Sequence, residues 1–75
     1  MHKLRKLSGK EMVNALSKFG FVYIRQKGSH VILKKRIENG EIGCVVPMHE
    51  ELKLGTIRGI LKQAKISEEE FVGVL

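Results

Sequence analysis

Apolar residues near the start of the chain recur with a helical period. Met12, Leu16 and Phe19 follow spacings of four and three, which make one apolar stripe on a helix. Ser8 is followed three residues later by Glu11, the pattern of a capping box, in which each residue caps the backbone of the other. Gly20 suits a left-handed C-terminal cap. The pattern predicts a helix over residues 9–19.

The middle of the chain has the pattern of short strands. Phe21 to Ile24 is rich in β-branched and aromatic residues, and Lys27-Gly28 follows as a turn. Asn39-Gly40 is the strongest hairpin signal, since both residues tolerate the positive φ of a type I′ turn. The links are short, so we expect an antiparallel meander. The predicted strands are residues 21–24, 29–36 and 41–46.

The last third returns to a helical period. Apolar residues at 57, 60, 61 and 64 predict a helix over residues 54–65, and Ser67 with Glu70 forms a second capping box that starts a short helix ending near Val72. The predicted fold is a single α+β domain over residues 1–75, with order α-β-β-β-α. Its helices cover one face of a three-stranded antiparallel sheet and leave the other face open. This two-layer layout is that of the double-stranded RNA-binding domain.

Charge is divided unevenly between the two parts of the chain. Residues 1–36 hold ten Lys or Arg and one acidic residue, a net charge of +9, whereas the whole chain has +6. Such a basic segment favours a polyanionic partner, although a lysine-rich solvated surface explains it equally well. Cys44 is the only cysteine and lies in an apolar run, so we expect a buried, inert thiol and no disulfide. We expect no metal or cofactor, no membrane span and a cytoplasmic location.

His30 is the first candidate for chemistry, because imidazole titrates near neutral pH. Gly28 lets the backbone come close to a ligand, and Ser29 offers a hydroxyl and an N–H beside the imidazole. Arg25 and Lys27 bring positive charge to the same corner, where a phosphate can sit. The alternative is an ordinary strand residue at a hairpin edge. A Ser29–His30 hydrolase dyad is disfavoured, because adjacent strand residues point to opposite faces.

His49 is the second candidate, and its role depends on the hairpin register. If Asn39-Gly40 forms a two-residue loop, Glu38 faces Glu41 and His30 then faces His49 across the ladder. Two imidazoles would share one site. A bulge or a longer loop would shift this register. The alternative for His49 is a loop residue that hydrogen-bonds the backbone.

RNA cleavage suits so small a set of groups, because RNA carries its own nucleophile, the ribose 2′-OH. A base removes that proton, the oxygen attacks the adjacent phosphate, and an acid protonates the leaving 5′-oxygen. Nearby Lys or Arg would stabilise the charge that develops on the phosphate.

Four segments of the chain resemble the HicA toxins of HicAB toxin–antitoxin systems. They are Gly20-Phe21, residues 25–30 (Arg-Gln-Lys-Gly-Ser-His), residues 46–49 (Val-Pro-Met-His) and residues 55–64. The resemblance implies an mRNA interferase that inhibits translation, with a fold like the double-stranded RNA-binding domain. It places the catalytic histidine at His30, and it implies a HicB-like antitoxin that covers the active face.

These observations lead to a hypothesis with two alternatives. The hypothesis is a metal-independent endoribonuclease acting on mRNA, not DNA, with His30 as catalytic residue and His49 as a candidate accessory group. The expected RNA-binding residues are Arg25, Lys27, Gly28, Ser29 and Lys34. The alternatives are a non-catalytic RNA-binding module of the same fold and a protein-interaction domain that meets an acidic partner. Neither alternative needs an imidazole after Gly28-Ser29.

Overall fold

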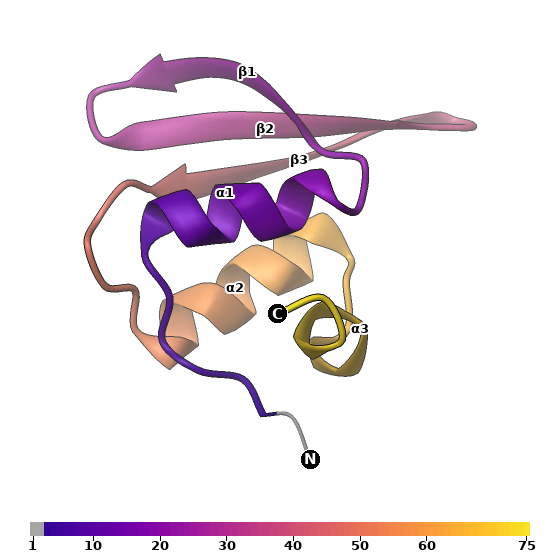
Figure 1. Cartoon of the computed structure of the whole chain (residues 1–75). Helices are drawn as coiled ribbons and strands as arrows, with labels where there is room; N and C mark the ends of the chain where they lie inside the picture. Colours follow the sequence, from indigo (N-terminus) through magenta and orange to yellow (C-terminus); the bar gives the residue numbers. More distant parts are fainter. Residues whose placement is uncertain (1–2) are drawn as a thin grey trace.

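The structure is a computed structural model, and it describes residues 3–75. The chain runs through one helix, three strands and two further helices, so the predicted α-β-β-β-α order with a short last helix is confirmed (Figure 1). The three strands form one antiparallel sheet in the order β1-β2-β3, and the helices lie on one side of it. The elements are α1 (Gly9–Ser17), β1 (Val22–Lys27), β2 (His30–Ile37), β3 (Gly40–Pro47), α2 (Leu54–Ala64) and α3 (Glu68–Val72).

Local capping determines where α1 begins. The Glu11 backbone N–H donates to the Ser8 hydroxyl over 3.0 Å, and the Ser8 N–H donates to the Glu11 carboxylate over 2.9 Å. This confirms the predicted capping box. The Ser8 N–H bond is also the main reason that the pKa of Glu11 lies below its usual value. The helix ends at Ser17, two residues earlier than predicted, because the Phe19 N–H already bonds back only three residues, to Leu16.

The first strand extends further than its apolar residues indicated. It runs to Lys27, and the turn that follows is Gly28–Ser29, one residue later than predicted. All six β1 residues are exposed. An edge strand with both faces in solvent has no alternation of apolar and polar positions, so its polar second half was not recognised. A β-bulge lies between Tyr23 and Arg25.

The second hairpin corrects the predicted register. Ile37 pairs with Gly40, so the turn residues are Glu38 and Asn39. Gly40 takes a positive φ of 143° while neither turn residue does, and a type I′ turn needs positive φ at both of its central positions. Each β2 residue therefore pairs with a residue two positions earlier than predicted. His30 faces Pro47, and the predicted pairing with His49 is wrong.

The core lies between the sheet and the helices. Val31 and Leu33 of β2 and Cys44 and Val46 of β3 point toward α1 and α2 and are almost fully buried. Phe71 of α3 is fully buried and stacks on Phe19, with ring centroids 6.4 Å apart. The alternate residues of β2 and β3 face away from the helices, so one sheet face stays open as predicted.

Candidate functional site

The β1–β2 hairpin places His30 at one end of the open sheet face. His30 is the first residue of β2 and pairs with Lys27 on one side and Pro47 on the other. Val31 next to it is buried against the helices, so the exposed His30 side chain projects from the opposite face. The imidazole is thus open to a ligand, with a lysine in the neighbouring strand position.

A short backbone contact holds this corner together. The Met48 N–H donates to the Ser29 carbonyl oxygen over 2.6 Å, which ties the Gly28–Ser29 turn to the end of β3. Gly28 has a φ of 61°, in the left-handed region that glycine adopts without strain. Ser29 belongs to the turn and not to a strand. Gly28 and Ser29 therefore form a tight, exposed turn directly before His30, and the bond to Met48 after β3 sets its position.

Three of the predicted RNA-binding cations share the face of His30. Lys27 pairs directly with His30, and Arg25 pairs with Ile32, which projects from the same face as His30. Lys34 lies on that face of β2 as well. Lys34 also makes an ion pair with Glu41 over 3.3 Å, a contact the sequence analysis missed because its hairpin register was shifted. Arg36 of β2 also lies on this face. Counting every second residue from His30 along the strand would have identified it from the sequence alone.

His49 lies in a different setting from the one predicted. It follows β3, it is exposed, and its carbonyl oxygen accepts a hydrogen bond from the Gly9 N–H over 2.9 Å. It lines a cavity of about 320 Å³ together with Ser8, Lys10, Met48 and Glu50. This bond is made by the main-chain carbonyl of His49 and does not involve its imidazole.

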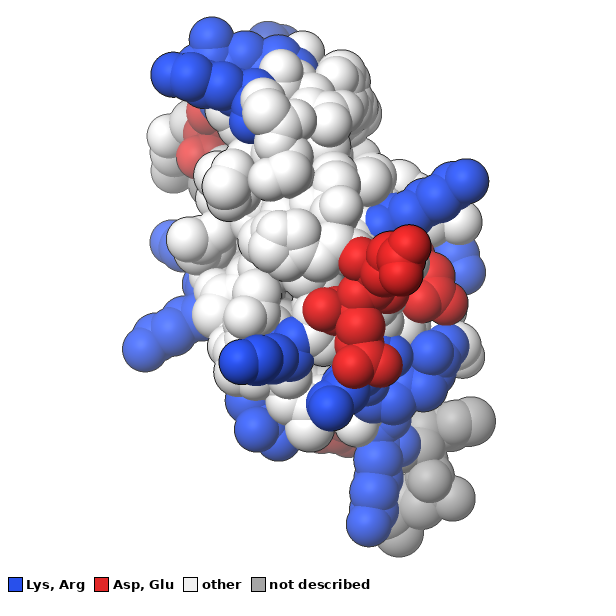
Figure 2. Space-filling view, turned by 90° about the vertical axis from the view of Figure 1, so that its left-hand side faces the viewer, with Lys and Arg blue, Asp and Glu red and all other residues white. Residues whose placement is uncertain are grey.

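The loop after β3 carries acidic side chains next to His49. Glu50 and Glu51 follow His49 in sequence, and Glu51 pairs with Lys6 over 3.8 Å. Figure 2 looks at this end and shows Lys and Arg side chains at the top, where β1 lies in Figure 1. An uncharged area lies below them, and a group of acidic side chains lies lower down. A phosphate is therefore attracted to the hairpin side, whereas the loop after β3 and its neighbours carry charges of both signs.

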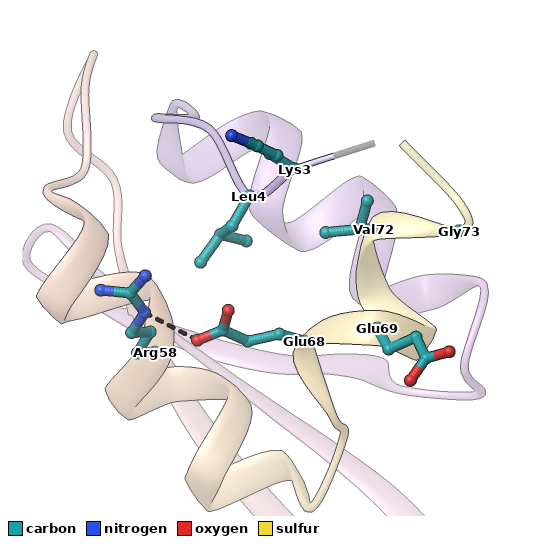
Figure 3. A pocket seen from close by; sticks show the side chains of 7 residues that line it. All are labelled: Lys3, Leu4, Arg58, Glu68, Glu69, Val72 and Gly73. Carbon is teal, nitrogen blue, oxygen red and sulfur yellow. Dashed lines mark hydrogen bonds and ion pairs between the residues drawn. The ribbon is translucent and has the colours of Figure 1, made fainter. Parts of the chain in front are cut away.

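A larger cavity, of about 630 Å³, lies between the N-terminal segment, α2 and α3. Figure 3 shows the Arg58 side chain pointing toward Glu68, and these two form an ion pair over 2.6 Å. Lys3 and Glu69 also line it, so its charges are mixed. None of its lining residues belongs to the sheet, so this cavity is separate from the His30 corner.

Cys44 behaves as predicted for an interior thiol. It is buried in β3, and burial raises its pKa to about 11. The thiol is therefore protonated near neutral pH and takes no part in the exposed site.

The sequence of residues 9–66 matches the model of a family described as "HicA toxin of bacterial toxin-antitoxin". The chain belongs to the HicA toxin family. Membership makes it the toxin of a bacterial toxin–antitoxin system, with a cognate antitoxin. No curated protein is significantly similar to this HicA chain. Within residues 3–75, its helices are too short and too polar to cross a membrane.

Proposed function

We propose that this HicA chain is a metal-independent endoribonuclease that cleaves mRNA in the cytoplasm and thereby inhibits translation, with His30 as its catalytic residue. The observation that supports the proposal best is the placement of His30. Its side chain is exposed on the open sheet face, in the strand position next to Lys27. Imidazole and cation thus adjoin on a surface that an RNA chain can reach.

The chemistry needs only proton transfer and charge stabilisation. His30 takes the proton of a ribose 2′-OH, and the oxygen attacks the adjacent phosphorus while the bond to the 5′-oxygen breaks. The departing 5′-oxygen takes a proton from the imidazolium or from water. One positioned imidazole contributes on the order of 10²–10⁴ in rate. Lys27 and Arg25 would stabilise the negative charge on the phosphate oxygens in the transition state.

The test is incubation of the purified protein with a long single-stranded RNA in excess EDTA. We expect fragments with 2′,3′-cyclic phosphate and 5′-hydroxyl ends from the wild type. His30→Ala should lower the rate by at least about 100-fold while keeping the wild-type melting temperature, because an exposed side chain contributes little to packing.

His49→Ala is the matched control, because it removes a second exposed imidazole from the same end of the molecule. We expect it to keep most of the activity, since His49 does not lie opposite His30. Full activity in His30→Ala would overturn the assignment, and so would wild-type activity that EDTA abolishes. RNA binding without any cleavage by the wild type would show a non-catalytic RNA-binding module instead.

The HicB-like antitoxin is proposed to act by covering His30. The corner is exposed and basic, so an acidic partner can pair with the cations that otherwise meet phosphate, and complementary charge would also speed association. Cleavage and chemical modification of His30 should both fall when the complex forms. A stable complex that leaves His30 reactive and cuts RNA at the free rate would contradict occlusion. Loss of activity with His30 still reactive would show inhibition by distortion of the hairpin.

A further inference from the structure

The strand register assigns every sheet residue to one of the two faces, and the open face carries an unusual composition. Residues paired across antiparallel strands project from the same side. The rows on the side of His30 are Lys27–His30–Pro47, Arg25–Ile32–Val45, Val22–Lys34–Gly43 and, at the far end, Arg36–Glu41. Four cations therefore share one sheet face with His30, and Glu41 is the one acidic residue among them.

The position of Lys35 shows how sharply the faces differ. Lys35 lies between two cations of the open face, but it projects to the helix side, where its aliphatic chain passes close to Gly20 at the end of α1. Three of its side-chain carbons lie within 3.5–3.8 Å of the place that a side chain at Gly20 would occupy. The run Lys34-Lys35-Arg36 is thus divided between the two sides of the sheet.

Apolar side chains lie between the cations of the open face. Val22 is 58% exposed and Val45 is 39% exposed, and Ile32 is partly exposed between Arg25 and Val45. An exposed apolar surface among cations suits single-stranded RNA, whose bases have free faces and whose backbone carries one charge per nucleotide. The bases of a duplex are stacked inside it and cannot make these contacts. Cleavage also favours a single strand, because the 2′-oxygen must line up with the leaving 5′-oxygen, and a regular RNA helix does not allow this.

We propose that single-stranded RNA lies along the open sheet face, from the His30 row toward the Arg36 row. Its phosphates contact Arg25, Lys27, Lys34 and Arg36, and its bases lie on Ile32 and Val45. The distance along β2 from His30 to Arg36 is about 20 Å. This inference rests on the proposed ribonuclease function and specifies its substrate as an unpaired strand.

One feature bears on the direction of the strand and a second on its base preference. On the other side of His30, the loop after β3 carries Glu50 and Glu51, which offset the positive charge of Lys6 and Lys10 there, so that phosphate is held less strongly than on the sheet face. The exposed aromatic ring of Tyr23 would be an obvious base-stacking group, but Tyr23 pairs with Leu33 and so belongs to the helix side of the sheet. The open face has aliphatic contacts in its place, which favours binding with little base preference.

The test measures binding by fluorescence anisotropy in the His30→Ala background, so that the RNA stays intact. The probe is a single-stranded RNA of about twelve nucleotides, titrated over a range of salt concentrations. Arg36→Gln should lower the slope of log K against log salt by about 0.7 and the affinity by about fivefold at 0.1 M salt. The double variant Arg25→Gln/Arg36→Gln should lose about 25-fold.

Lys35→Gln is the matched control, because it removes the same charge from the neighbouring residue on the other face. It should leave affinity and slope unchanged, as should Tyr23→Ala. Equal losses in Arg36→Gln and Lys35→Gln would overturn the proposal, because binding would then depend on overall charge and not on this face. A melting curve for each variant confirms that it is folded.

Val45→Tyr tests the placement of the bases. A ring at this position should tighten binding of the single strand by about fivefold. It should leave the affinity for the same strand annealed to its complement unchanged. Equal tightening for both probes, or none for either, would overturn the contact with bases.

The outcomes separate this inference from the function on which it rests. Equal rates of RNA cleavage by the wild type and by Arg36→Gln, at RNA concentrations well below saturation, would overturn the binding face alone, because Arg36 has no part in the proposed chemistry. A wild type that neither binds nor cuts RNA would overturn both. If the double variant keeps its RNA affinity and loses only its antitoxin, the open face is a protein-binding surface and the proposal is wrong.

Discussion

Gly9 is the residue at which the packing of α1 against the candidate site is most easily tested. It is the first residue of α1, it is buried, and its N–H donates to the His49 carbonyl oxygen. A Cβ at this position would overlap the Pro47 carbonyl oxygen and would lie 2.7 Å from the Met48 Cα. Both neighbours are backbone, which cannot rotate away as a flexible side chain can. The absence of a side chain lets α1 approach the end of β3.

We expect Gly9→Ala to destabilise the protein by about 2 kcal/mol. Overpacking costs about 1–3 kcal/mol, and the upper part of this range applies because backbone must move. The higher helix propensity of alanine offsets up to about 1 kcal/mol. In a domain of this size the melting temperature should fall by about 8–16 °C. RNA cleavage should also fall, because Met48 is the residue that bonds to Ser29 in the hairpin turn.

Gly59→Ala is the matched control, since Gly59 also lies in a helix but has no neighbouring atom within 4 Å of the position that a Cβ would occupy. This variant should be more stable than the wild type, by about 1 kcal/mol. Thermal unfolding followed by circular dichroism measures both variants. If Gly9→Ala is as stable as Gly59→Ala, the close approach of α1 to Pro47 and Met48 is wrong.

Three further predictions address the core, the first helix and the RNA face. Burial raises the pKa of Cys44 to about 11, so the unfolded chain loses the thiol proton first as pH rises above about 8.5. The free energy of unfolding of the wild type, measured by urea denaturation relative to Cys44→Ala, should therefore fall by about 2–3 kcal/mol between pH 8 and pH 11. If the difference between the two proteins stays constant over this pH range, the thiol is not buried. Ser8→Ala should cost about 1 kcal/mol by removing the cap of α1, whereas Ser17→Ala, whose hydroxyl bonds within the helix, should be close to neutral in the same assay. Glu41→Gln should release Lys34 and tighten single-stranded RNA binding, and Glu38→Gln in the β2–β3 turn should do so less; equal effects would show that the Lys34–Glu41 pair does not limit binding.

Elements governed by local interactions were predicted well from the sequence. The capping boxes at Ser8 and Ser67 form as expected, and α2 begins at the predicted Leu54 and ends within one residue of the prediction. Capping and helical periodicity involve residues three or four positions apart, so the signal is contained in a short stretch of chain. The buried faces of α1 and α2 follow from the same periodicity.

The strands were predicted less well because their signals depend on distant parts of the chain. Alternation appears only where one face of a strand is buried, and β1 has both faces exposed. The register of the second hairpin depended on which residue takes a positive φ, and Gly40 does so while Asn39 does not. Because of that difference, His30 pairs with Pro47 and not with the predicted His49.

By itself the sequence determined the class of fold, the presence of a turn at Gly28 and the family, because each depends on a short motif or a local period. Tertiary structure decided which cations share a face with His30 and which glycine could not be replaced. The period of two within β2 already separates Lys35 from Lys34 and Arg36, but only the pairing of β2 with β1 places Arg25 and Lys27 on the face of His30. Gly9 and Gly59 are both helix glycines in the sequence. Only the packing of α1 against the end of β3 makes a side chain unfavourable at Gly9, because the space that a Cβ would need is already filled by backbone.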